Sequence, residues 1–228
     1  MALILAIETA TKICSVALFK NNELIDCEEL GGQYSHAELL APFTDTLLKR
    51  NGCKIADLNA IAVSKGPGSY TGLRIGVAFA KGICYGNSIP LIAINTLEAM
   101  AYGAIEKLKD NNALYCPMID ARRMEVYVSL FHANGEELEA VTAKIIDETS
   151  FEEKLKSQKV YFFGDGAAKC QSILNATNAD FSYSGETSAR HMGNLAFQKY
   201  ELQQFEDLAY FEPYYLKEFL AIKSKKLV

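Results

Sequence analysis

Residues 7–22 (IETATKICSVALFKNN) and residues 119–134 (IDARRMEVYVSLFHAN) decide the fold, because they match without a gap at an offset of 112 positions (119 minus 7). The identical pairs are Ile7/Ile119, Val16/Val128, Leu18/Leu130, Phe19/Phe131 and Asn22/Asn134. In each stretch an apolar strand ends in a carboxylate, Glu8 or Asp120, and a turn leads into a second strand. These identities can arise by chance in apolar strands, but the shared order of strand, acid, turn and strand favours a duplication.

A duplication of this kind predicts an α/β protein with two ribonuclease H-like lobes, each a mixed sheet with helices. This is the actin/sugar-kinase/Hsp70-like ATPase fold, and the likeness concerns the fold without establishing a function. We expect an N-terminal lobe over residues 1–108 and a smaller C-terminal lobe over residues 109–228, whose last segment returns to the first lobe.

Hydrophobic periodicity predicts the elements of both lobes. Strands are expected at residues 3–7, 13–19, 23–30, 60–64, 90–94, 115–120, 125–131, 139–145 and 160–163. Helices are expected at residues 72–85, 97–108, 150–156, 167–175 and 188–203. A further helix begins with the capping-box pattern from Ser35 to Glu38 and ends at Asn51-Gly52.

Composition indicates an ordinary globular protein. The 228 residues are 50% hydrophobic, and the six cysteines contain no C-x-x-C pair, so we expect reduced core cysteines. The chain has no signal-peptide pattern and no apolar run of about 18 residues, which predicts a cytoplasmic protein without a membrane segment. A net charge of −5 argues against a surface that binds nucleic acid over its whole area, so we expect any contact with RNA to run through a partner. The basic run Lys223-Ser224-Lys225-Lys226 is interpreted as a solvated tail, or as a contact with nucleic acid in a complex.

The glycine-rich stretch at residues 65–76 (KGPGSYTGLRIG) runs from a strand into a helix and could bind an anion at the helix start. It is not a P-loop, because no Gly-Lys-Ser/Thr follows at the required spacing. It is not a nucleophile elbow, because Pro67 replaces the first glycine of G-x-S-x-G before Ser69. A structural use is favoured.

Small residues recur on one face of the helix that follows this loop, where they could serve internal packing or a subunit interface.

A nucleotide cleft between the lobes is a weaker hypothesis. Its candidate residues are Glu8, Thr9, Thr11, Asp120, Gly164, Asp165 and Gly166. The first hairpin lacks the glycine that lets a backbone approach phosphate oxygens closely, and a tight strand-to-helix turn explains residues 164–166 equally well. The charged stretch from Asp120 to Glu125 is interpreted as a solvated turn. The histidines His36, His132 and His191 stand apart at non-ligand spacings, so we expect no metal site and no catalytic residue.

Six stretches, spread over the whole chain, resemble the TsaB (YeaZ) family in order and placement. They are residues 5–18 (LAIETATKICSVAL), 35–42 (SHAELLAP), 66–83 (GPGSYTGLRIGVAFAKGI), 119–127 (IDARRMEVY), 164–169 (GDGAAK) and 213–217 (PYYLK). The resemblance implies the two-lobed ATPase-like fold and an accessory role in tRNA modification. In that role a threonylcarbamoyl group is moved onto the adenosine 3′ of the anticodon in tRNAs that read codons beginning with A.

The resemblance also implies partners. The catalytic paralogue TsaD would pair through helices of the first lobe, the ATPase TsaE would join them, tRNA would be contacted indirectly, and the chain alone would form a homodimer. Mapped onto this sequence, the interface would lie on the helices at residues 36–49 and 72–85. Its candidate residues are His36, Leu39, Leu40, Phe43, Leu47, Gly72, Leu73, Gly76, Val77 and Ala80. We expect Gly76→Trp to abolish pairing with TsaD while leaving the fold largely intact. His36 stands alone where the catalytic paralogue needs two histidines, so we expect no peptidase or ATPase activity. No cofactor is expected, apart from the option of a nucleotide at a subunit junction. Competing hypotheses are a small-molecule kinase of the same fold, a peptidase, and a homodimeric scaffold unrelated to tRNA.

Overall fold

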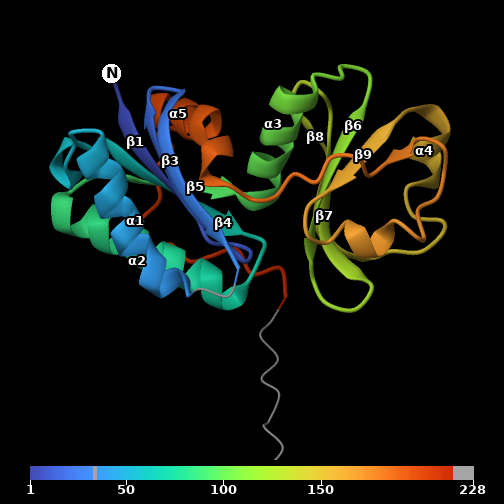
Figure 1. Ribbon diagram of the computed structural model, residues 1–228, viewed down its shortest axis with the longest axis horizontal. Helices are drawn as coiled ribbons and strands as arrows, with labels where there is room; N and C mark the ends of the chain where they lie inside the picture. The colour runs from blue at the N-terminus through green and yellow to red at the C-terminus, as the bar shows by residue number, and fades with distance from the viewer. Residues whose placement is uncertain (33–34, 218–228) are drawn as a thin grey trace, which may run out of the picture.

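The computed structural model describes residues 1–32 and 35–217 and contains two lobes side by side (Figure 1). The first sheet has the order β3-β2-β1-β4-β5, and the second repeats it as β8-β7-β6-β9-β10. In both sheets the first two pairings are antiparallel and the last two are parallel. The predicted duplication of a mixed sheet is therefore confirmed.

The strands of the first sheet are β1 (Leu3–Glu8), β2 (Ile13–Lys20), β3 (Glu23–Gly31), β4 (Ala60–Gly66) and β5 (Leu91–Asn95). The strands of the second sheet are β6 (Leu114–Asp120), β7 (Glu125–Phe131), β8 (Glu137–Ile145), β9 (Val160–Phe163) and β10 (Ala179–Asp180). The α-helices are α1 (His36–Arg50), α2 (Tyr70–Asn87), α3 (Thr96–Leu108), α4 (Glu152–Ser157) and α5 (Gly193–Glu201). Three-ten turns are η1 (Ile55–Asp57), η2 (Ala168–Cys170) and η3 (Ala189–His191).

The lobes exchange covering helices. Helices α1 and α2 cover one face of the first sheet, and α5, from the second half of the chain, covers the other face. Helix α3, from the first half, packs on the second sheet against Tyr115, Ile119 and Phe131, and its Ala99 also joins the cluster on the first sheet. Figure 1 shows α3 and α5 between the two sheets. This exchange holds the walls of the cleft between the lobes in place, because each lobe buries apolar surface of the other half.

The gapless alignment of residues 7–22 with residues 119–134 places the first strands of the two hairpins one residue out of register. Ile7 pairs with Val16, whereas Ile119 pairs with Tyr127 and not with Val128. Ile7 packs in the cluster facing α1 and α2, and Ile119 packs in the cluster facing α3. A one-residue shift moves a strand side chain to the other face of its sheet, so the lobes align only with a gap in the turn.

Three element predictions need correction. Ser35 lies at the N-cap position of α1, but its side chain caps no backbone amide. The helix predicted at residues 167–175 is only the three-ten turn η2, because the amides of Cys170 and Ile173 donate to the carbonyls three residues earlier. The helix predicted at residues 188–203 is divided into η3 and α5, where Gly193 lies so close to the Phe19 ring that a Cβ would overlap it.

The segment from residue 202 to residue 217, here called the strap, runs back over the first lobe. The amide of Glu206 donates to the Leu91 carbonyl at 2.9 Å, and that of Tyr214 donates to the Lys65 carbonyl at 2.7 Å. Leu208 and Phe211 pack on the cluster beneath α2. The strap thereby reaches the cleft between the lobes, and the basic run at residues 223–226 lies outside the described residues.

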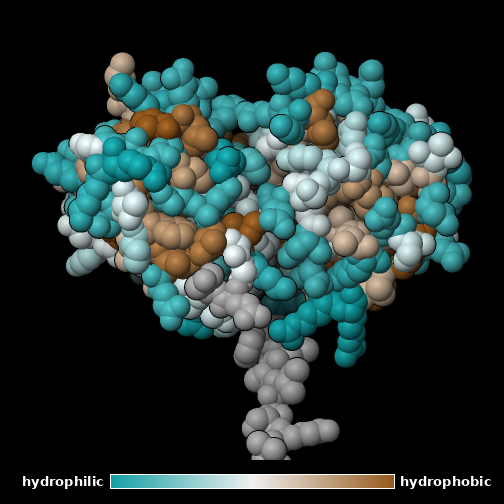
Figure 2. Space-filling model, in the orientation of Figure 1, coloured by the Kyte–Doolittle hydropathy of each residue, from teal (hydrophilic) through white to brown (hydrophobic). Residues whose placement is uncertain are grey.

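The face in view is mostly hydrophilic, with smaller hydrophobic patches on both lobes (Figure 2). Within the described ranges, helices fall short of the length and apolarity that crossing a bilayer requires. The six cysteines are unpaired thiols.

Candidate functional site

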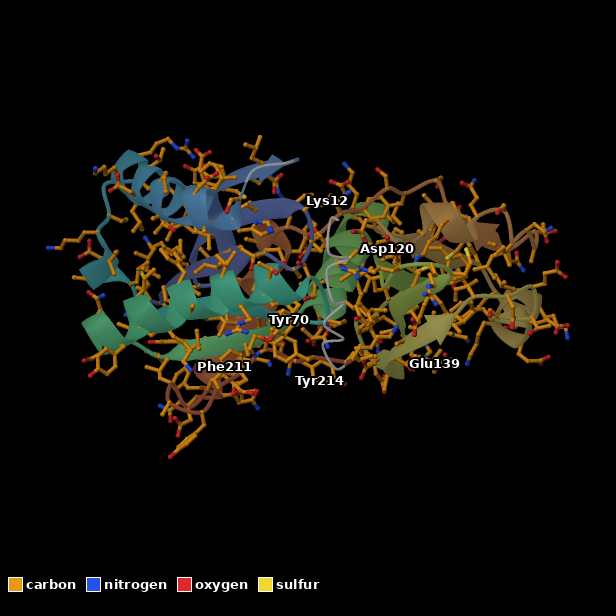
Figure 3. All side chains as sticks on the ribbon, turned by 90° about the horizontal axis from the view of Figure 1, so that it is seen from below. Lys12, Tyr70, Asp120, Glu139, Phe211 and Tyr214 are labelled. Atoms are coloured by element: carbon orange, nitrogen blue, oxygen red, sulfur yellow. The ribbon has the colours of Figure 1, made fainter. Side chains whose placement is uncertain are left out.

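A cleft of about 930 Å³ lies between the lobes. Figure 3 shows Lys12 and Asp120 on its two sides, with Tyr70 and Tyr214 along the first lobe. Its walls are the β1–β2 turn, the loop before α2, the β6–β7 hairpin, Asp165 and the end of the strap. The cleft therefore joins segments that the sequence places far apart.

The glycine-rich loop packs on the β1–β2 turn. The Ser69 amide donates to the Ala10 carbonyl at 2.6 Å, and a Cβ on Gly68 would overlap the same carbonyl. A Cβ on Gly72 would overlap the Thr9 carbonyl. The Ser69 hydroxyl also accepts a hydrogen bond from the Gly72 amide at 3.2 Å and so caps α2. The predicted structural use of this loop is confirmed, because its glycines allow close backbone packing within the lobe.

Backbone groups of the β1–β2 turn are already engaged. The Ala10 amide donates to Glu8 Oε1 at 2.6 Å, and the Ile13 amide donates to Thr11 Oγ1 at 3.3 Å. On the carbonyl side, His36 Nε2 donates to Thr11 O at 2.8 Å. A phosphate bound at a turn needs free amides, and the amides of Ala10 and Ile13 are not free for that role.

Glu8 and Thr9 lie beneath the cleft instead of lining it. Both are fully buried, and the Thr9 hydroxyl has no hydrogen-bond partner among the described residues. Burial raises the pKa of Glu8 to about 7, although hydrogen bonds from the Ala10 amide and the Ser64 hydroxyl oppose the shift. Thr11 does line the cleft, and its hydroxyl lies 2.6 Å from that of Thr187, in the second half of the chain.

In the second lobe, the candidate residues Asp120 and Asp165 line the cleft. The Asp120 amide donates to Asp165 Oδ1 at 2.9 Å, and burial raises the pKa of Asp165. The pKa of Asp120 is lowered overall. Burial alone would raise it, but the hydrogen bonds from Lys169 and the Arg122 amide have the larger effect. The site therefore holds a carboxylate stabilised in its charged form beside one that is not.

Gly164 and Gly166 do not line the cleft. A Cβ on Gly164 would overlap the Met118 carbonyl, and one on Gly166 would lie 2.9 Å from the Ile119 carbonyl carbon. Gly164 also has a φ of 101°, which favours glycine. Their placement in the cleft was wrong, because both glycines serve the close approach of the turn to β6.

The sequence interpretation missed the basic and aromatic character of the cleft. Exposed side chains of Lys12, Arg122 and Arg123 line it, and the lining tyrosines are Tyr70, Tyr127, Tyr214 and Tyr215. The stretch from Asp120 to Glu125 was interpreted as a solvated turn, which overlooked that the duplication places it opposite the β1–β2 turn. The signal that could have identified this site is the presence of basic residues shortly after Glu8 and Asp120, the carboxylates that end the two matched strands.

The predicted interface residues divide into two groups. Leu40, Leu47, Gly72, Leu73, Gly76, Val77 and Ala80 are buried within the first lobe. His36, Leu39 and Phe43 are half-buried. The small residues of α2 therefore pack on the β1–β2 turn of their own chain, and the expectation that Gly76→Trp would leave the fold intact was wrong.

The described residues offer little for nucleophilic or metal chemistry. Burial lowers the pKa of His191 to about 4 and raises those of the Cys14 and Cys84 thiols to about 12. The His36 ring contacts a backbone carbonyl and not a hydroxyl or thiol. Within residues 1–32 and 35–217, His, Cys, Asp and Glu side chains form no group of three or more that could hold a metal ion.

Comparison with known proteins supplies the family. A family model described as TsaD, tRNA N6-adenosine threonylcarbamoyltransferase, matches residues 32–227. A tRNA threonylcarbamoyladenosine biosynthesis protein TsaB of Buchnera aphidicola subsp. Schizaphis graminum is 31% identical over 171 residues, which cover 73% of this chain and 80% of that protein. The chain belongs to the TsaB (YeaZ) branch of the TsaD family.

Other relatives agree with this placement. TsaB of Escherichia coli K12 is 40% identical over 144 residues, 60% of this TsaB-family chain and 61% of that protein, so the match spans about three fifths of its length. A solved structure from Pseudomonas aeruginosa, described as similar to peptidase YEAZ, has a TM-score of 0.81 at 23% identity and covers 95% of this chain and 100% of its own. At this identity, the likeness bears on the two-lobed fold and not on the function.

Proposed function

We propose that the chain is a non-catalytic accessory subunit for transfer of a threonylcarbamoyl group onto the adenosine 3′ of the anticodon in tRNA. The transfer belongs to a TsaD partner, a TsaE ATPase joins the complex, and the chain forms a homodimer when alone. The role in threonylcarbamoyladenosine biosynthesis is supported above all by the match to 80% of a TsaB relative named for this process. The cytoplasmic location expected from the sequence is part of this proposal.

The geometry of the site supports an accessory role. The kinase alternative needs a phosphate-binding turn, whereas the amides of Ala10 and Ile13 donate within the β1–β2 turn itself. The peptidase alternative needs an activated nucleophile or a metal, and the His36 ring is held by the Thr11 carbonyl. The structure does not distinguish a homodimeric scaffold unrelated to tRNA from this proposal, and the depletion experiment below does.

The proposed partner surface is the outer face of α1 and α2. Exposed Ala41, Arg74 and Ala78 lie on this face, while half-buried Ile75 and Phe79 pack against the cluster beneath. Small exposed side chains beside half-buried apolar ones allow another helix to approach closely. This surface replaces the buried glycine face as the candidate interface.

Depletion of the chain in cells tests the function. We expect threonylcarbamoyladenosine in bulk tRNA to fall on depletion and to return on expression of the wild-type chain. Unchanged threonylcarbamoyladenosine after depletion would favour the scaffold unrelated to tRNA.

A further inference from the structure

We propose that the cleft between the lobes binds a short single-stranded segment of RNA directly, with phosphates at Lys12, Arg122 and Arg123 and a base stacked on the tyrosines of the rim. The proposal rests on the proposed function, which supplies RNA as the ligand class. It replaces the expectation that tRNA contact is only indirect.

The first support is a set of exposed cations on both walls of the cleft, although the charge of Lys12 acts on Asp120 and Asp165 and favours their ionised forms. Lys12 lies on the β1–β2 turn, and Arg122 and Arg123 lie on the β6–β7 hairpin, so both lobes contribute. All three side chains are exposed and form no ion pair with another described residue. Long basic side chains left unpaired on both walls of a groove are typical of proteins that track a phosphate backbone.

The second support is that two of the carboxylates lining the cleft, Asp120 and Glu125, already have amine partners. Lys169 pairs with Asp120 and also donates to the Glu125 carbonyl at 2.7 Å. Lys217 of the strap pairs with Glu125. These pairs reduce the repulsion that the two carboxylates would exert on a bound phosphate, while Asp165 accepts a hydrogen bond from the Asp120 amide.

The third support is the backbone of the hairpin. Arg122 and Arg123 have φ angles of 70° and 51°, the left-handed region that bulky side chains rarely adopt. Two consecutive arginines in this conformation are energetically unfavourable, and such backbone conformations concentrate at functional sites. In an ordinary solvated turn, Asn or Gly would adopt this conformation more easily.

The fourth support is an aromatic rim. The Tyr70 and Tyr215 rings lie 4.9 Å apart, and the Arg74 guanidinium lies 5.4 Å from the centre of the Tyr70 ring. Tyr214 beside them is 44% exposed. Bases stack on such rings with little regard to sequence. Cations on both walls with tyrosines at the rim fit an extended strand better than a mononucleotide, because the amides of Ala10 and Ile13 donate within the turn and are lost to a mononucleotide's phosphates.

The experiment measures anisotropy of a fluorescein-labelled single-stranded RNA of about eight nucleotides against the full chain. The main variant is Arg122→Asn/Arg123→Asn, because Asn tolerates the left-handed backbone. Its matched control is Lys107→Asn/Lys109→Asn, which removes two exposed cations at the end of α3, one of them also at a positive φ of 53°. Lys12→Gln tests the opposite wall and remains informative if the hairpin variant fails to fold.

We expect saturable RNA binding that weakens about tenfold in the hairpin variant. The slope of log affinity against log salt concentration should fall by about 0.7 for each phosphate that the variant no longer neutralises. Lys12→Gln should weaken binding too, and the control should not. Absence of RNA binding, equal weakening in the control, or tighter binding of ATP, ADP or poly-glutamate than of RNA would each overturn the proposal.

A cellular arm separates this proposal from the proposed function. If the wild-type chain fails to restore threonylcarbamoyladenosine after depletion, the proposed function fails. If the wild-type chain restores the modification and the hairpin variant restores it equally while binding RNA normally, only the cleft proposal fails. We expect the hairpin variant to co-purify with TsaD and to restore the modification poorly.

Discussion

Gly76 of α2 lies directly against the Thr9 hydroxyl, so close that a Cβ at this position would overlap the oxygen. The contact fastens the helix to the β1–β2 turn, and Gly72 makes the equivalent contact with the Thr9 carbonyl one helical turn earlier. The row of small residues on α2 therefore belongs to the architecture of the cleft wall, and its outer neighbours remain available for a partner.

Replacement of Gly76 tests this packing. We expect Gly76→Ala to lower the free energy of unfolding by about 1–3 kcal/mol, because the added methyl group has no room. Gly82→Ala in the same helix is the matched control, since no atom lies within 4 Å of its Cβ position, and it should stabilise the protein by about 0.5–1 kcal/mol. Urea unfolding measures both, and equal effects would contradict the packing.

Glu8 gives a pH dependence with a definite sign. Its folded pKa of about 7 exceeds the ordinary value of 4.5, so the folded state binds the proton more tightly than the unfolded state does. Its contribution is therefore most favourable below pH 4.5 and is lost as the pH rises to about 7. Glu8→Gln keeps Oε1 as an acceptor and removes the titration. In urea unfolding, the free energy of unfolding of the variant relative to that of the wild type should rise by up to roughly 3 kcal/mol between acid and neutral pH. A difference that stays constant with pH would refute this assignment.

The strap should depend on Gly66. This glycine has a φ of 110°, and a Cβ on it would lie 2.8 Å from the Tyr214 carbonyl oxygen. We expect Gly66→Ala to loosen the strap and to speed chymotrypsin cleavage after Phe205, Tyr210 or Phe211. Gly52→Ala, at a φ of 66° with open space around it, should be destabilised without faster cleavage in the strap. Identical cleavage patterns would show that Gly66 does not hold the strap.

The outer face of α1 and α2 predicts where pairing is sensitive. Ala78→Arg places a long charged side chain on this face and should reduce co-purification with TsaD at least about tenfold, because a close helix contact cannot accommodate it. Ala140→Arg makes the same change at an exposed position of β8 in the other lobe and should have no effect. Pairing that survives Ala78→Arg would place the interface elsewhere.

The sequence was sufficient for the α/β class and the duplicated lobes, because strand alternation and the order of strand, acid and turn survive in both halves. It was insufficient for contacts between elements. Periodicity shows that Gly72 and Gly76 share a face of α2 but not that Thr9 lies against it. Nor can it show that α3 and α5 cover the opposite lobes, because an apolar face does not identify its partner.

The cleft illustrates the same limit. Asp120 and Asp165 were identified because each ends a strand or occupies a tight turn. Lys12, Arg122 and Arg123 were not, because exposed charges in a hairpin are ordinary until the fold places them across a groove from each other.

Reconstitution of threonylcarbamoyl transfer onto tRNA from purified components tests the central claim most directly. With a TsaD partner, TsaE, ATP and the threonylcarbamoyl donor present, the account predicts multiple-turnover transfer when this chain is added and little without it, and none from this chain alone. Equal transfer without the chain, or transfer by the chain in the absence of TsaD, would contradict it.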